Sequence, residues 1–93
     1  MRQEREIYLM KPSQQTSPLS LSEIPTGEQA VLVEVDAKKM NPSRLASLGF
    51  TPGVLIQMTQ NYGRGPLVVT VRGTRVALGR SEAANIFVKR NTL

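Results

Sequence analysis

Apolar and polar residues alternate along several short stretches of this chain, with the two-residue period of a half-buried β-strand. The stretch 28–36 shows the pattern most clearly, because Val31, Val33 and Val35 stand at every second position. We expect these valines to point into the core, while Leu32 indicates that the opposite face is also partly covered. The same alternation predicts four more strands, at residues 54–60, 67–71, 75–79 and 86–90.

Turn residues separate the predicted strands at regular intervals. Glycine tolerates positive φ and proline presets one backbone dihedral, so both favour tight turns. The sequence NYGRGP at 61–66 predicts a hairpin loop, and RGT at 72–74 predicts a tight turn. We expect structural roles in turns for Gly27, Gly49, Pro52, Gly53, Gly65, Pro66 and Gly73.

The order of strands and turns predicts the fold class. About five short strands with one or two short helices are typical of a mainly β domain, here a small antiparallel barrel that is closed or partly open. Closure would remove exposed sheet edges, which so small a sheet cannot otherwise protect. The length of 93 residues agrees with a single domain. We expect residues 18–93 to form this domain and residues 1–17 to form a flexible N-terminal tail that ends in KPSQQTSP.

The sequence NPSRLASLGF at 41–50 predicts a short helix. Asn41 is a favourable N-cap, and Pro42 suits the first helical position because the N–H that proline lacks would be unpaired there. Gly49 suits the left-handed position that follows many helices. A second helical turn is expected at SEAANI, with Ser81 as its cap.

The apolar residues of this first helix allow two interpretations. Phe50 directly follows the expected helix stop, where it would pack back on Leu45. In the first interpretation Leu45, Leu48 and Phe50 belong to the core. In the second, part of this edge is exposed, and Arg44, Leu45, Leu48 and Phe50 are candidate partner-binding residues on a small apolar patch.

The chain is basic, with a net charge of +5 and a pI near 10.3. Such a charge suits nucleic acid or an anionic membrane surface. However, the 12 Lys and Arg are scattered along the sequence, and interleaved aromatic residues that would stack on bases are missing. We therefore expect no nucleic acid partner, and a small basic barrel that binds nucleic acid is kept as the alternative function.

Catalytic and metal-binding residue types are scarce. The chain has no His and no Cys, which removes the usual proton carrier at neutral pH and the soft metal ligands. Glu34 and Asp36 share a strand face, which we interpret as solvated rather than as a catalytic pair. Arg44 and Arg80 could act as arginine fingers for a nucleotide-hydrolysing partner, but surface solubility is the plainer interpretation. We expect no enzyme activity, no cofactor and no metal site.

The sequence shows neither a membrane span nor a signal peptide. No stretch approaches the roughly 18 apolar residues of a membrane span. The N-terminus also lacks the basic and then apolar plan of a signal peptide. We therefore expect a cytoplasmic protein, and the absence of Cys fits a reducing compartment.

From about Leu19 to Val88 the chain carries three blocks in order: LSEIPTGEQAVLVEV, RLASLGFTPGVLIQM and GPLVVTVRGTRVALGRSEAANIFV. In this order they closely resemble the FeoA family, small proteins of bacterial ferrous-iron uptake. Gly79-Arg80 departs from the family pattern, which more often has a basic pair there. The most specific matches are Arg44, Leu45, Leu48, Gly49, Pro52, Gly53, Gly65, Pro66, Leu67, Ala77 and Leu78.

The resemblance implies an SH3-like β-barrel with a helical insertion. It implies a role beside FeoB, a membrane Fe(II) transporter with a cytoplasmic GTPase domain, which the chain would bind or regulate without carrying iron. The protein would then lie in the cytoplasm, peripheral at the inner membrane through its partner. A homo-oligomer is a further alternative. The same barrel recurs at the C-terminus of DtxR-type repressors, but no winged helix precedes it here, so we do not expect a complete repressor.

Overall fold

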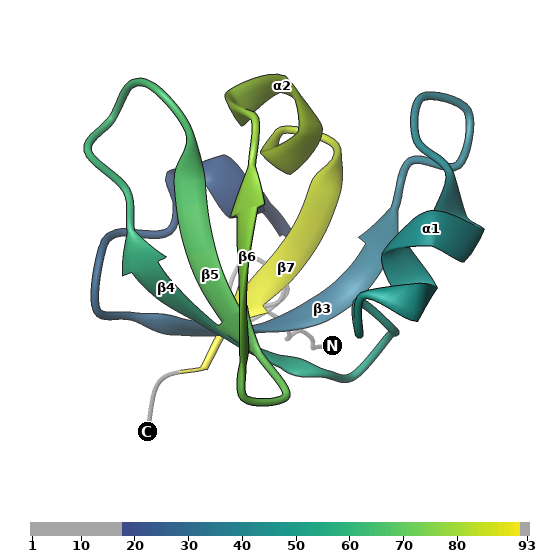
Figure 1. Ribbon diagram of the computed structural model, residues 1–93, viewed down its shortest axis with the longest axis horizontal. Helices are drawn as coiled ribbons and strands as arrows, with labels where there is room; N and C mark the ends of the chain where they lie inside the picture. Colours follow the sequence, from purple (N-terminus) through teal and green to yellow (C-terminus); the bar gives the residue numbers. More distant parts are fainter. Residues whose placement is uncertain (1–17, 92–93) are drawn as a thin grey trace, which may run out of the picture.

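The computed structural model describes residues 18–91, which form one six-stranded antiparallel sheet with short helical segments. The strand order is β2-β7-β3-β4-β5-β6, so β7, the last of the described strands, lies between β2 and β3. Figure 1 shows the sheet curled over itself, with β3 crossing its base. The elements are β2 (Leu19–Ser20), the 3-10 helix η2 (Leu21–Glu23), β3 (Gln29–Val35), α1 (Pro42–Ser47), β4 (Leu55–Gln60), β5 (Leu67–Val71), β6 (Thr74–Leu78), α2 (Arg80–Ala83) and β7 (Ile86–Arg90).

This architecture confirms the predicted mainly β fold and adds one strand to it. β5 and β7 coincide with the predicted strands, and β4 and β6 each begin one residue away from the expected start. The added strand, β2, has only two residues and pairs with β7, so it is too short for an alternating pattern to be visible in the sequence. Within the described residues the end strands β2 and β6 do not pair with each other, which leaves the barrel partly open.

The core lies inside the curled sheet and consists of apolar side chains. Among residues 18–91 no polar or charged side chain is buried. Phe50 is the one aromatic residue in the described core, so most buried side chains are aliphatic, and each buried Leu, Ile, Val or Met contributes about 1.5–3 kcal/mol. The buried residues are Leu21, Ile24, Ala30, Leu32, Leu45, Phe50, Ile56, Met58, Leu67, Val69, Val71, Leu78, Ala83, Ile86 and Val88.

The prediction for the faces of β3 is wrong over most of the strand. Ala30 and Leu32 are the buried residues of β3, with 0% and 2% of their surface exposed. Val31 and Val33, expected in the core, are only half-buried on the outer side. Alternation alone could not separate the two faces, because both carry apolar residues.

An irregularity in the pairing of β3 with β7 explains which residues face the core in the second half of β3. Leu32 is opposite Val88 and Glu34 is opposite Phe87, so Val33 is an extra residue on β3. Such a bulge reverses which residues face the core. Val35 accordingly packs against the core, as the sequence pattern predicted.

Helix α1 begins as its sequence predicts. The Oδ1 atom of Asn41 accepts hydrogen bonds from the backbone N–H groups of Ser43 at 3.0 Å and Arg44 at 3.3 Å. Pro42 occupies the first helical position, where its missing N–H costs nothing. The helix is therefore fixed at its N-terminus by residues within its own first turn.

The end of α1 also follows its sequence prediction. Gly49 has a φ of 102°, and its N–H donates to the carbonyl oxygen of Ala46 at 3.0 Å. The N–H of Phe50 donates to the carbonyl oxygen of Leu45 at 2.9 Å. These two bonds define a Schellman motif, in which the residue after the glycine packs back on the helix. The side chains of Leu45 and Phe50 accordingly belong to one core cluster.

The prediction that Ser81 caps the second helical turn is wrong. α2 begins at Arg80, and the preceding Gly79 is its N-cap. The Oε1 atom of Glu82 accepts a hydrogen bond from the N–H of Gly79 at 2.9 Å. An acid three residues after the cap satisfies this N–H, which moves the start of the helix ahead of the serine.

The flexible tail expected at residues 1–17 lies outside the described residues. Between residues 18 and 91 no helix has the length and apolar character needed to cross a membrane.

Candidate protein-binding site around α1

The four candidate partner-binding residues lie on two different sides of α1. Leu45 and Phe50 are 1% and 3% exposed, so they hold the helix on the barrel and offer no surface to a partner. Arg44 is exposed, and 37% of the Leu48 side chain is accessible. Residues four apart share one side of a helix, which places Arg44 and Leu48 together on one flank.

The flank with Arg44 faces α2. The Nη1 atom of Arg44 lies 3.3 Å from Oε2 of Glu82, and both side chains are more than a third exposed. Such an exposed ion pair contributes at most about 1 kcal/mol to stability. A polar hollow of about 230 Å³ lies beside this pair, between the two helices. This flank therefore offers one exposed leucine next to charged and polar groups.

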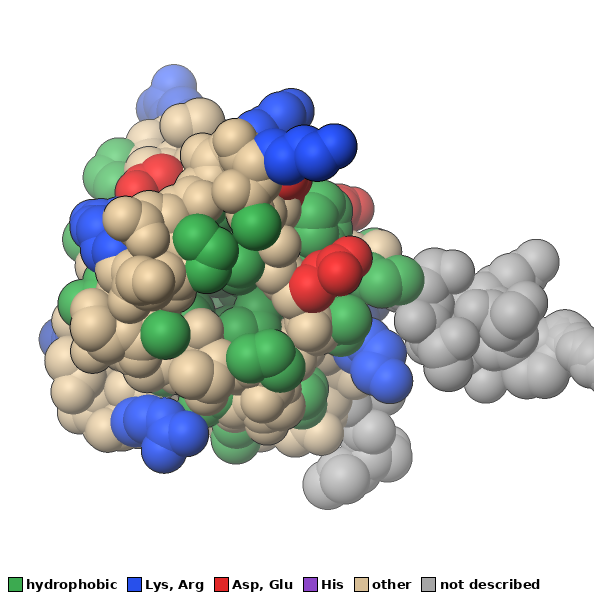
Figure 2. Space-filling view, turned by 90° about the vertical axis from the view of Figure 1, so that its right-hand side faces the viewer, with side chains coloured by type: hydrophobic (Ala, Val, Ile, Leu, Met, Phe, Trp, Pro, Cys, Tyr) green, Lys and Arg blue, Asp and Glu red, His purple; other side chains and the backbone are tan. Residues whose placement is uncertain are grey.

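The opposite flank of α1 borders an apolar hollow of about 240 Å³. Figure 2 looks onto the side of the molecule that carries α1 and shows hydrophobic side chains gathered around a depression. A concave apolar lining of this size accommodates an aliphatic or aromatic side chain of another molecule. The lining residues are Leu32, Glu34, Val35, Pro42, Ala46, Phe50, Thr51 and Pro52.

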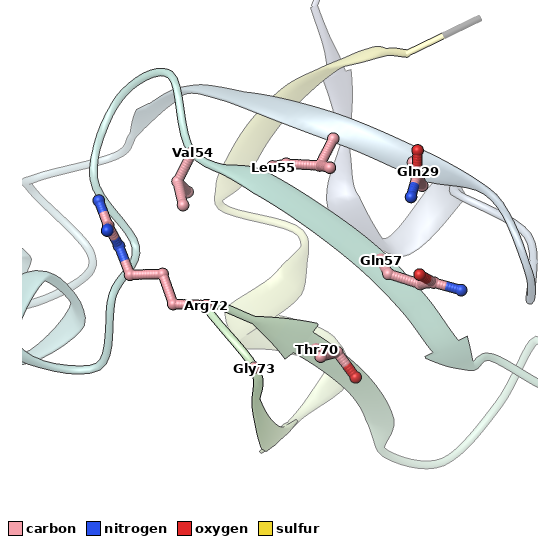
Figure 3. Close-up of a pocket in the computed structure, with 7 residues that line it drawn as sticks. All are labelled: Gln29, Val54, Leu55, Gln57, Thr70, Arg72 and Gly73. Carbon is pink, nitrogen blue, oxygen red and sulfur yellow. The ribbon is translucent and has the colours of Figure 1, made fainter.

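A third hollow, of about 370 Å³, lies on the outer face of β3, β4 and β5 (Figure 3). Gln29 is opposite Gln57, which is opposite Thr70, so three polar side chains form a row across the strands. In Figure 3 Arg72 extends away from this row, and Leu55 lies beside it with 44% of its surface exposed. The hollow has no carboxylate in its lining and therefore lacks a group for acid–base chemistry.

Arg80 has a structural role that neither interpretation of this residue foresaw. Its Nη2 donates to Oδ1 of Asn61 at 2.7 Å, and its Nε donates to the carbonyl oxygen of Gly65 at 3.3 Å. The Nδ2 of Asn61 in turn donates to the carbonyl oxygens of Ser22 at 3.0 Å and Ile24 at 2.8 Å. We call these five residues the loop junction, because they join α2 to two loops of the barrel.

No cluster of metal-ligating side chains is assembled in the described part of the molecule. Within residues 18–91 no three His, Cys, Asp or Glu side chains come together. Of the two acids predicted to share a face, Glu34 is exposed, and Oδ1 of Asp36 accepts a hydrogen bond from the N–H of Lys38 at 3.0 Å in the turn after β3. The described surface around α1 offers an apolar hollow and exposed charged side chains.

A small, partly open antiparallel barrel with such a surface defines the class of SH3-like modules. The FeoA domain model matches residues 19–90 of this chain. The chain therefore belongs to the FeoA family, as the blocks of its sequence indicated.

Two curated proteins illustrate the family. The putative Fe(2+) transport protein A of Methanocaldococcus jannaschii is 30% identical over 63 residues, covering 68% of this chain and 76% of that protein. A fusion of Fe(2+) transport protein A with the Fe(2+) transporter FeoB from Porphyromonas gingivalis is 35% identical over 72 residues. That match covers 76% of this chain but only 8% of the fusion protein.

Solved structures agree with the fold. FeoA of Stenotrophomonas maltophilia, solved as a zinc complex and described as a prokaryotic SH3 domain protein, is 37% identical with a TM-score of 0.67, over 76% of this chain and 89% of that one. The T. acidophilum repressor IdeR has a TM-score of 0.70 at 17% identity, over 82% of this chain and 35% of that one. This second likeness concerns the fold alone and matches the expected recurrence of the barrel in repressors.

Proposed function

We propose that this chain is a non-enzymatic accessory protein of Fe(II) transport, which docks on the cytoplasmic part of a FeoB-type transporter and modulates it. One observation carries the proposal: the relative from P. gingivalis is a fusion of Fe(2+) transport protein A with FeoB. Joining two modules in one chain raises the effective concentration of one at the other, which is useful when the two bind each other. Fe(II) is then the cargo of the partner.

The surface that we assign to docking is α1 with its two flanks. One flank presents Leu48 beside the charged pair of Arg44 and Glu82. The other borders the apolar hollow between α1 and β3. Apolar anchors surrounded by polar groups are the usual composition of a protein-binding surface. Docking here places the protein at the cytoplasmic side of the inner membrane through its partner.

A charge substitution on the exposed flank tests this surface. Leu48→Arg places a cation at a partly exposed position at the end of α1, where positive charge is tolerated by the helix. We expect it to weaken binding to the purified, full-length transporter by about tenfold or more, because an apolar anchor is lost. Co-purification and Fe(II) uptake in cells measure the effect.

The matched control is Tyr62→Arg, since Tyr62 is 74% exposed in the loop between β4 and β5. Figure 1 places this loop on the opposite side of the barrel from α1. We expect binding within about twofold of the parent chain, because a position outside the interface contributes little. A folded Leu48→Arg variant that binds as well as this control contradicts the assignment of the surface.

Modulation of the transporter is tested separately from binding. GTP hydrolysis and nucleotide exchange by the transporter are measured over a range of concentrations of this protein. A change that saturates together with binding supports modulation, and unchanged rates restrict the proposal to docking. Light scattering at two concentrations of the isolated chain shows whether it docks as a monomer or as a homo-oligomer.

A further inference from the structure

The sheet ends at β6, which has no neighbouring strand beyond it among the described residues. β6 follows β5 through a two-residue turn, Arg72 and Gly73, whose φ values are 51° and 79°. Positive φ at both positions is the signature of a tight hairpin in which the flanking residues form a hydrogen-bonded pair. Here these residues are Val71 and Thr74, and hydrogen-bonded pairs recur at every second position along the strand.

The backbone groups of Arg75 and Ala77 therefore point away from β5. These residues face Thr70 and Val68 in the pairs that lack hydrogen bonds, whereas Val76 directs its own groups toward β5. Within residues 18–91 neither Arg75 nor Ala77 has a backbone hydrogen bond outside the strand pairing. Together they offer two donors and two acceptors with the spacing of an extended chain.

The edge of β6 is suited to accept a further strand. It is regular, because its pairing with β5 continues over five residues without a bulge. It contains no proline, and both outward-pointing residues have exposed side chains. Bulges, prolines and covering segments are the usual devices that protect an edge, and among residues 18–91 the only such device at β6 is the charge of Arg75.

The charge of the sequence stretch that contains this edge, with Arg72 and Arg75 in the hairpin itself, favours an acidic occupant. Between Asp36 and Glu82 the sequence has no acid, although it includes α1, β4, β5 and β6. No ion pair between described residues involves the arginines of this hairpin or of the loop before it. A second copy of so basic a chain would be repelled, whereas an acidic segment would be attracted. The cations of this stretch are Lys38, Lys39, Arg44, Arg64, Arg72, Arg75 and Arg80.

The edge is also continuous with the proposed docking surface. A Cβ atom placed on Gly49 would lie 3.1 Å from Cγ1 of Val71 and 3.3 Å from Cδ of Arg72. The end of α1 therefore rests against the turn from which β6 begins. A partner that contacts Leu48 can reach the hairpin without leaving the surface.

We propose that β6 binds an extended, acidic segment of the FeoB-type partner, which adds to the sheet as a seventh strand. The inference rests on the proposed function in that this partner supplies the segment. Main-chain hydrogen bonds to Arg75 and Ala77 hold the segment, and its Asp and Glu side chains pair with the arginines of the hairpin. Contacts to the backbone supply affinity, and the charges select the partner.

Hydrogen exchange in the unmodified complex tests the strand addition directly. The chain is mixed with full-length transporter in detergent, and deuterium uptake is read at single residues by electron-transfer fragmentation. The amides of Arg75 and Ala77 are expected to exchange at least about tenfold more slowly in the complex, because they become hydrogen-bonded. The amide of Val76, already bonded to β5, changes little.

A proline substitution tests the same bond by mutation. Ala77→Pro removes an N–H that points outward, so the pairing with β5 keeps its bonds, and an edge position tolerates proline. Its control, Ala77→Val, keeps the N–H and suits a strand. We expect the proline variant to bind at least about tenfold more weakly than the valine variant. The hydrogen bond from the N–H of residue 77 to the added strand is lost, and the proline ring obstructs the adjacent interstrand bond.

The outcomes separate this inference from the proposed function. A stable complex in which Arg75 and Ala77 exchange as fast as in the free chain overturns strand addition and leaves docking on the transporter intact. Equal binding of the two Ala77 variants does the same. Failure of the unmodified chain to bind the transporter overturns both. If the amide spectrum shows that the proline variant is unfolded, the hydrogen-exchange measurement on the unmodified chain decides whether a strand is added.

Discussion

The α1 segment and the loop junction are both fixed by an asparagine, but the two asparagines work over different distances. Asn41 binds the N–H groups of Ser43 and Arg44, two and three residues away. Asn61 binds the carbonyl groups of Ser22 and Ile24, which are 39 and 37 residues away. The first asparagine has its partners wherever a helix starts, whereas the second acquires them only when the barrel has formed.

The same difference separates the bonds at the end of α1 from those of Arg80. Gly49 and Phe50 donate to Ala46 and Leu45, within one helical turn. Arg80 donates to residues 15 and 19 positions before it in the chain. Local bonds define an element, and the long-range bonds join elements. Three substitutions, in order of expected effect, test how far the local segment depends on the barrel.

The largest effect is expected for Leu45→Ala. The Leu45 side chain is 1% exposed, and its truncation leaves a cavity beneath α1. The free energy of unfolding should fall by about 2–5 kcal/mol, as for other buried leucines. Leu48→Ala, on the same helix but partly exposed, is the control and should cost less than about 1 kcal/mol. Equal losses in urea titrations would show that the local caps, and not the core, hold the helix.

An intermediate effect is expected for Asn61→Ala, which removes the centre of the loop junction. Two carbonyl groups and the guanidinium of Arg80 lose a partner, so we expect a loss of about 1–3 kcal/mol in the free energy of unfolding. Asn61→Asp separates these contributions, since a carboxylate still accepts from Arg80 but cannot donate to Ser22 and Ile24. Thermal unfolding of both variants measures the difference. A fully stable alanine variant would show that the junction contributes no stability.

The smallest effect is expected for Asn41→Ala, because a lost N-cap typically costs about 1 kcal/mol. Asn41→Asp retains a capping oxygen and should stay within a few tenths of the parent chain. Chemical denaturation at matched ionic strength compares the two. A larger loss for Asn41→Ala than for Asn61→Ala would reverse the comparison, and would mean that local capping outweighs the long-range junction.

The fold was predictable to the extent that its signals are local. The caps of α1 and the ranges of β5 and β7 follow from residues next to each other in the sequence. The inward face of β3 did not, because both of its faces carry apolar residues and because the bulge at Val33, which returns Val35 to the core, is defined only by the pairing with β7. Two signals in the sequence compete for the N-cap of α2: the serine at position 81, and Gly79 with an acid, Glu82, three residues later. The structure follows the second signal.

The candidate site was predictable only in part. The sequence directed attention to residues 44–50, and the period of the helix could have separated Arg44 and Leu48 from the buried Leu45. The apolar hollow beside β3 and the position of β6 at the edge of the described sheet were not visible in the sequence. Both depend on which strands become neighbours, since residues far apart in the chain line the hollow and the strand order alone makes β6 an edge.

The position of β7 in the middle of the sheet has a consequence for how the protein is made. During synthesis β3, β4, β5 and β6 can pair in succession as they leave the ribosome, because each is next to the one before it. Of the strands within residues 18–91, β2 emerges first, and the strand it pairs with there, β7, follows last. Because β7 joins β2 to β3, the described sheet can be completed only after β7 has left the exit tunnel.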